Sequence, residues 1–143
     1  MTNSVKPPIW FWAVSVISLL WNIMGVFNYL NQAYNKEAML ETLSQVQREA
    51  FESIPAWATA AFAIAVFSGF FASLALLLRK KWAKPLFTLS LIAAIAQFIS
   101  WLFVSNAAEA FGPTAYLMPI IVVIIGVYLI LFSGKGIRNG WLS

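Results

Sequence analysis

The chain has 143 residues, of which 62% are hydrophobic and only 10% are charged, and its nine Lys or Arg against five acidic residues give a net charge of +4. So apolar a chain cannot cover its hydrophobic surface in water, which excludes a soluble fold, and basic residues beside short turns between apolar segments indicate membrane orientation rather than a nucleic-acid partner. Because cysteine and histidine are absent, no disulfide, thiolate or imidazole is available, and we expect neither a metal nor a cofactor.

Four long apolar segments predict an all-α fold, a four-helix transmembrane bundle that forms one integral membrane domain over residues 1–143. The first segment, residues 9–30, follows Pro7 and Pro8. It is longer than the roughly 7–15 apolar residues of a signal peptide, so we expect it to remain as the first span. The other spans are expected at residues 57–78, 86–105 and 116–132, each near the roughly 20 residues that a bilayer core requires. Aromatic residues near the segment ends support these boundaries: Trp10, Trp12, Tyr29, Trp57, Trp82, Trp101, Tyr116 and Trp141.

The connection between the first two spans is too long for a plain turn and predicts an amphipathic extramembrane helix over residues 36–54. Apolar residues recur along it at spacings of three and four, and acidic residues dominate the opposite side. An acidic surface is not attracted to anionic lipid, so we expect this helix to dock on the bundle, as a structural cap or alternatively as a lid. The apolar positions are Met39, Leu43, Val46, Ala50 and Ile54.

Charges of the two signs occupy alternate connections. All five acids follow the first or the third span: Glu37, Glu41, Glu49, Glu52 and Glu109. Most basic residues belong to the other connections or to the chain ends: Lys6 and a basic rim of Arg79, Lys80, Lys81, Lys84, Lys135 and Arg138. Because basic residues are retained on the cytoplasmic side of a bilayer, we predict a multi-pass protein of a bacterial inner membrane. Both termini should be cytoplasmic, and the helix over residues 36–54 should be periplasmic.

Uncharged polar residues lie within the predicted spans, where lipid offers them no hydrogen-bond partner. Ser18, Asn22 and Tyr29 share one face of the first span, and Ser90 and Gln97 share one face of the third. Asn22 and Gln97 fall near mid-membrane, so both should point inward, and a direct or water-bridged contact between them would satisfy both. The five residues mark either a hydrogen-bonded helix contact, which is the commoner use of such amides, or a polar pocket or path. No acid or base lies at this depth to couple transport to protons.

The second span carries a small residue at every fourth position, at Ala61, Ala65, Gly69 and Ser73. Small residues at this spacing let a partner backbone approach closely, which is a main source of helix association in lipid. Because three other spans offer neighbours, we expect this face to pack within the bundle, with a homodimer contact as the alternative. Pro119 predicts a kink in the fourth span.

Motifs spread over nearly the whole chain carry a resemblance: Pro-Pro-Ile-Trp at 7–10, Trp-Asn-x-x-Gly at 21–25, Pro-Ala-Trp at 55–57, Leu-Leu-Leu-Arg-Lys-Lys-Trp at 76–82 and Asn-Gly-Trp at 139–141. In these the chain resembles a group of small, uncharacterised bacterial four-span inner-membrane proteins that are loosely labelled "sugar transporter", and its layout is similar to that of DoxX-like four-helix proteins. The resemblance implies the four-span fold and no catalytic residues. The chain differs from small multidrug transporters because it lacks their membrane-embedded glutamate in the first span.

The sequence therefore predicts a non-enzymatic integral membrane protein with a structural or accessory role, which binds a lipid or a partner membrane subunit. The alternative is a small transporter of a neutral or polar solute that works as a homo-oligomer without intramembrane charge coupling. The expected partners are the lipid bilayer and a second copy or another membrane subunit, with no metal and no nucleic acid.

Overall fold

The computed structural model describes residues 6–104, 109 and 111–143 of the chain. This part of the chain is all-α and contains no strand, which confirms the predicted fold class. Four of its helices are long and apolar enough to cross a membrane, so the chain is a multi-pass membrane protein. Ser105, the predicted end of the third span, lies outside the described residues. The long helices are α1 (Ile9–Tyr34), α4 (Ala56–Leu77), α5 (Ala83–Ile99), which continues as the π-helical segment η1 (Ser100–Val104), and α7 (Leu117–Arg138), which follows the 3-10 helix η2 (Gly112–Tyr116).

The helix boundaries follow proline residues and the ends of the apolar segments. Pro8 and Pro55 are the N-cap residues of α1 and α4, where a missing amide hydrogen costs no helical hydrogen bond. α1 continues to Tyr34 and α7 to Arg138, beyond the predicted ends at residues 30 and 132, because a helix does not have to stop where the hydrocarbon core ends. Large apolar side chains such as Leu131 face outward, as expected for helices that contact lipid.

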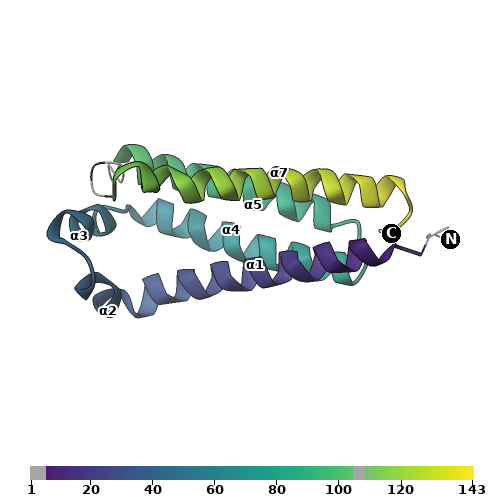
Figure 1. Ribbon diagram of the computed structural model, residues 1–143, viewed down its shortest axis with the longest axis horizontal. Helices are drawn as coiled ribbons and strands as arrows, with labels where there is room; N and C mark the ends of the chain where they lie inside the picture. Colours follow the sequence, from purple (N-terminus) through teal and green to yellow (C-terminus); the bar gives the residue numbers. More distant parts are fainter. Residues whose placement is uncertain (1–5, 105–108, 110) are drawn as a thin grey trace.

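The four long helices pack in the order α1, α4, α5 and α7. α4 and α5 form a central pair, while α1 and α7 run along opposite edges of the bundle in Figure 1. α4 packs against α1 and α5 packs against α7, but the backbones of α1 and α7 do not pack closely against each other. The bundle therefore has a lateral seam between its first and last helices.

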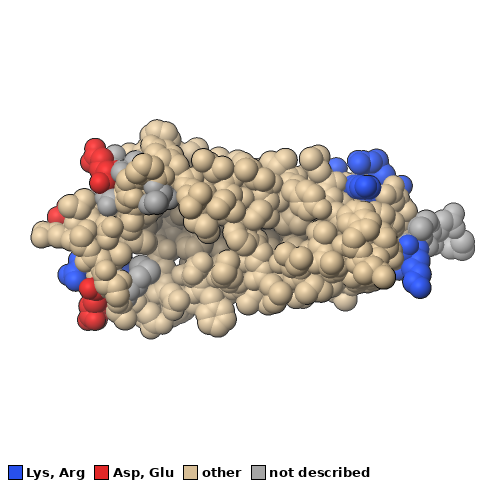
Figure 2. Space-filling view, viewed as in Figure 1, with Lys and Arg blue, Asp and Glu red and all other residues tan. Residues whose placement is uncertain are grey.

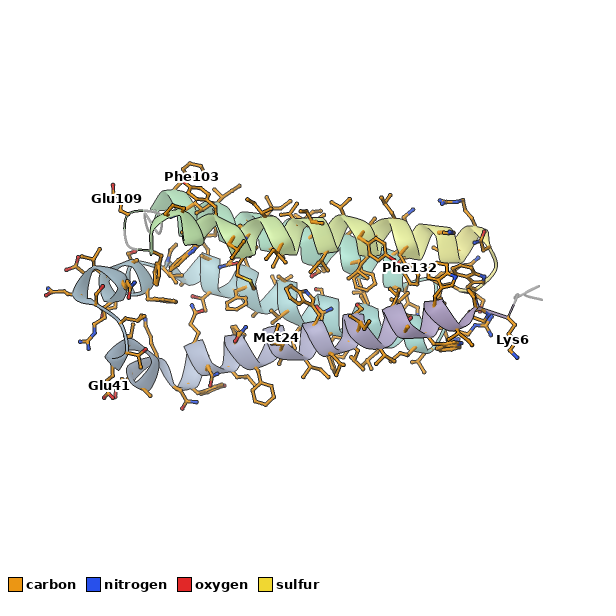
Figure 3. The ribbon with its side chains drawn as sticks, viewed as in Figure 1. Lys6, Met24, Glu41, Phe103, Glu109 and Phe132 are labelled. Carbon is orange, nitrogen blue, oxygen red and sulfur yellow. The ribbon has the colours of Figure 1, made fainter. Side chains whose placement is uncertain are left out.

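Charges separate to the two ends of the bundle. The start of α1, the C-terminal residue Ser143 and the α4–α5 turn lie at one end, which we call the basic end, and Lys6 is labelled there in Figure 3. Glu41 and Glu109 mark the opposite, acidic end, where Figure 2 shows the acidic side chains gathered. The alternation seen along the sequence is thus also a separation in space. The side of the membrane that each end faces stays a prediction.

Aromatic packing closes the basic end. Figure 3 shows Phe132 pointing from α7 toward α1, where its ring centroid lies 5.6 Å from that of Phe11 and 5.5 Å from that of Trp10. Trp141, beyond the end of α7, folds back with its ring centroid 5.2 Å from Trp10 and 5.7 Å from Phe11. We call these four side chains the aromatic cluster. Among the described residues, ring contacts between α1 and α7 occur only at this end.

The last three residues, Trp141–Ser143, which we call the C-terminal clasp, form hydrogen bonds that connect this cluster to the α4–α5 turn. The Ser143 amide donates to the Arg79 carbonyl at 3.0 Å, and the Lys81 amide donates to the Ser143 carbonyl at 3.1 Å. The Arg79 side chain donates from Nε to the Trp141 carbonyl at 2.9 Å. Arg79 has a φ of 57°, a left-handed conformation that costs a residue with a side chain roughly 1–2 kcal/mol. The clasp contacts help to hold Arg79 in this unfavourable conformation.

The extramembrane segment between α1 and α4 is helical, but the predicted single helix over residues 36–54 is two helices, α2 (Lys36–Glu41) and α3 (Gln45–Glu52). Ser44 causes the break, because its hydroxyl accepts from the Gln47 amide at 3.3 Å while the Gln47 side chain accepts from the Ser44 amide at 3.2 Å. This reciprocal capping box starts a new helix instead of continuing the old one.

The break also changes the predicted apolar stripe of this segment. Val46 is 55% exposed, whereas Ala50 is buried and Phe51 and Ile54 turn toward the bundle. Arg48 donates from Nε to the Leu40 carbonyl at 2.8 Å, which ties α3 to the end of α2. The side chain of Met39, another predicted member of the stripe, lies outside the described part of the structure.

Candidate functional site

A cavity of about 380 Å³ lies within the bundle and is lined by residues of all four long helices. This volume falls in the range of small-molecule sites, roughly 300–1,000 Å³. None of the described residues that line the cavity is Lys, Arg, Asp or Glu. Four carboxamide side chains contribute to the wall: Asn22, Asn28, Gln32 and Gln97.

The wall changes in character along the bundle. Toward the basic end it is apolar, with Phe87 of α5 and Leu129 of α7. Toward the acidic end it includes Phe51 of α3, whose ring centroid lies 5.0 Å from that of Trp101 and 5.8 Å from that of Phe111. The segment between α1 and α4 therefore covers the acidic end of the cavity.

Carboxamides continue from the cavity to the acidic end of α1. A second hollow shares Asn28 and Gln32 with the cavity and adds Asn31 and Asn35 to its wall. Amides can donate and accept hydrogen bonds without carrying charge. A polar molecule near this end would meet hydrogen-bonding groups along successive turns of α1.

The cavity also opens sideways, through the seam between α1 and α7. Met24 of α1, labelled in Figure 3, and Met118 of α7 both line the cavity, yet their side chains are 49% and 45% exposed. Figure 2 shows a recess in the face that lies between these two helices. In a bilayer this opening would face lipid, because it lies between two helices that are long and apolar enough to span the membrane.

Asn22 is fixed within the bundle by α4 rather than by α5. Its Nδ2 donates to the Ser18 carbonyl at 2.8 Å and to Ser73 Oγ at 3.1 Å. Ser73 Oγ donates to the Gly69 carbonyl at 2.9 Å, so the Ser18 hydroxyl, 2.7 Å away, must be the donor to Ser73. The Asn22 carbonyl oxygen occupies the space that a side chain on Gly69 would need.

Gln97 is placed differently, and the predicted direct contact with Asn22 is not present. Gln97 lines the cavity, and its carboxamide makes no hydrogen bond to another described residue. Ser90, about two helical turns before Gln97 on α5, also lines the cavity and donates to the Ala65 carbonyl of α4 at 2.6 Å. Among the described polar residues predicted at mid-membrane, Gln97 thus keeps both the donor and the acceptor of its carboxamide for a ligand, whereas the Asn22 amide nitrogen is already used.

The other two predicted polar residues lie away from the cavity wall. Ser18 is buried in the contact with Ser73, and Tyr29 packs its ring 5.6 Å from that of Phe62 of α4. Sequence reasoning missed Asn28 and Gln32 as residues of the cavity wall. They follow Gly25, which also lines the cavity, at spacings of three and four residues, and this could have indicated one inward face.

The small residues of α4 pack within the bundle in this structure. Ala65, Gly69 and Ser73 are buried, and Ala61 is partly buried. The position that a Cβ of Gly69 would take is close to both the Asn22 side chain of α1 and Ser90 Oγ of α5. Three helices approach closely at this level because α4 has no bulky side chain there.

Comparison of the chain with protein-family models, with curated proteins and with solved structures gave no match. The resemblance to small bacterial four-span proteins stays a prediction, and functional inference rests on the cavity.

Proposed function

We propose that this protein is a non-enzymatic accessory protein of a bacterial inner membrane that binds a neutral amphiphilic molecule in the cavity between α1 and α7. The observation that carries this proposal is a cavity with amides and aromatic rings on its wall, no charged residue among its described lining, and a side opening between apolar helices.

The wall chemistry favours a neutral ligand. An ionised group in a site without a counter-charge would bear a large desolvation cost, whereas hydroxyl, ester or amide groups can pair with carboxamides. Gln97, with no described hydrogen-bond partner, can both donate and accept. The apolar wall at Phe87 and Leu129 suits the hydrocarbon part of the same molecule.

The side opening favours entry from the bilayer over passage through the bundle. The aromatic cluster closes the basic end, so a solute that entered at the acidic end would not find an open path across the membrane. Transport of a neutral polar solute by an oligomer is the second candidate, and the row of amides toward the acidic end is the observation that favours it.

Gln97→Leu is expected to weaken binding of a neutral lipid about three- to tenfold, because the ligand loses one hydrogen bond, while the unfolding temperature stays unchanged. The measurement is saturable quenching of tryptophan fluorescence by a brominated diacylglycerol in phosphatidylcholine nanodiscs, since Trp21 and Trp101 both line the cavity.

Gln45→Leu is the matched control, because Gln45 is exposed at the start of α3 and does not line the cavity. Unsaturable quenching, or equal binding by the Gln97→Leu and Gln45→Leu variants, would contradict the proposed site. Flux of a neutral solute that Gln97→Leu abolishes would favour the transporter instead.

The proposed orientation predicts a labelling pattern. The chain has no cysteine, so single cysteines can be introduced without background. We expect Glu41→Cys and Glu109→Cys to react with an impermeant maleimide added to the periplasmic side, and Lys81→Cys and Arg138→Cys to react only after the membrane is opened. The reverse pattern would place both termini in the periplasm.

A further inference from the structure

Two cationic side chains from different helices converge at the basic end of the bundle. Lys84 lies in the first turn of α5, and Arg138 is the last residue of α7. Arg138 Nη1 lies 3.5 Å and Lys84 Nζ lies 3.6 Å from the position that a Cβ of Gly134 would occupy. Because Gly134 has no side chain, the two charged groups share one small area above its backbone.

This convergence has no acidic side chain to balance it. Neither Lys84 nor Arg138 forms an ion pair within the described part of the chain, and Figure 2 shows the acidic side chains at the opposite end. Two like charges so close repel each other. The positive end of the α5 dipole adds to the positive potential around Lys84.

The pair lies where lipid headgroups are expected. Trp10 and Trp82 at this end are partly exposed, as interfacial tryptophans usually are, and Leu131, one turn before Gly134 on α7, is largely exposed. An anion held by the pair would therefore have apolar surface beside it on one side and water on the other.

We propose that Lys84 and Arg138 form a binding site for a phosphate group. Arginine offers a planar fork of donors that matches phosphate oxygens, and lysine adds a mobile point charge. The phosphate can belong to the headgroup of an anionic phospholipid or be inorganic phosphate, and both would use the same two groups. This site is separate from the cavity and does not depend on what the cavity binds.

Other basic residues of the rim provide a control with equal charge. Lys80 and Lys81 lie in the α4–α5 turn with exposed side chains. Lys84→Gln with Arg138→Gln and Lys80→Gln with Lys81→Gln each remove two positive charges from the same end of the molecule. A purely diffuse attraction to anions would fall equally in both double variants.

The test measures phosphatidylglycerol bound to each variant by native mass spectrometry, after release from nanodiscs that contain phosphatidylcholine and phosphatidylglycerol. We expect about tenfold weaker phosphatidylglycerol binding for the Lys84/Arg138 variant than for the Lys80/Lys81 variant, because charge-assisted hydrogen bonds are lost in the first case alone. All four side chains are exposed, so both variants should fold, and a thermal unfolding scan checks this.

A competition arm identifies the source of the phosphate. Displacement of phosphatidylglycerol by millimolar inorganic phosphate, but not by chloride at equal ionic strength, supports a site that accepts free phosphate. Resistance to inorganic phosphate, with the same loss in the Lys84/Arg138 variant, supports a lipid headgroup. Equal binding by the two double variants would overturn the proposal.

Discussion

Trp141→Ala is expected to lower the free energy of unfolding by about 3 kcal/mol, at the lower end of the cost of removing a buried aromatic side chain. Trp141 is only 7% exposed, and its ring contacts Trp10, Phe11 and Phe132. Alanine would leave a cavity at the contact that joins α1 to α7. The loss can be measured by SDS-induced unfolding in mixed micelles.

Trp57→Ala is the matched control for this experiment. Trp57 lies in the first turn of α4 and is 53% exposed, so the same substitution leaves no enclosed cavity and should cost less than about 1 kcal/mol. Equal losses at positions 57 and 141 would mean that the preference of indole for the membrane interface, and not packing in the aromatic cluster, sets the effect.

Gly69→Ala is expected to destabilise the protein by about 2 kcal/mol, a typical cost of inserting a methyl group into a packed interior. The new methyl group would coincide with the Asn22 carbonyl oxygen and lie 3.2 Å from Ser90 Oγ. Asn22 would have to move, which breaks its bond to Ser73 and separates α1 from α4. Thermal unfolding in detergent, followed by circular dichroism, measures the effect.

Two further variants sharpen this prediction. Gly134→Ala makes the same change in a helix where the nearest neighbours would be at 3.5 Å or more, so the better helix propensity of alanine should leave stability unchanged or raise it by up to about 1 kcal/mol. Asn22→Ala together with Gly69→Ala removes the clashing carboxamide, so the double variant should be more stable than the sum of the single losses predicts. Additive losses would show that Asn22 does not occupy the space beside Gly69.

The positions of the spans could be predicted because they depend on properties local to each segment. Length, apolar composition and bounding prolines such as Pro55 determine where a helix can cross a bilayer. The inward direction of Asn22 could also be predicted, since a carboxamide in lipid has no partner. The partner of Asn22 could not be predicted. Whether Asn22 meets Ser73 of α4 or Gln97 of α5 depends on the order of the helices around the bundle, which the sequence does not state.

Features of the chain ends and connections were harder to predict. Ser44 and Gln47 form a capping box that divides residues 36–54 into two helices. The sequence interpretation gave more weight to the apolar spacing of this segment than to this local signal. The return of Trp141 onto the aromatic cluster depends on the left-handed turn at Gly140, which has a φ of 77°, and on the distant Arg79 side chain. An interfacial tryptophan and a packed one look the same in a sequence.

The firm contact between α1 and α7 at the basic end gives these helices a shared pivot. No described hydrogen bond or ring contact joins the two helices directly at the acidic end. A rotation of about 5° at Phe132 would move Leu117, at the far end of α7, by about 2 Å, since the helix between them is about 22 Å long. Such a rotation would widen the opening between the two helices toward the acidic end without bending either helix.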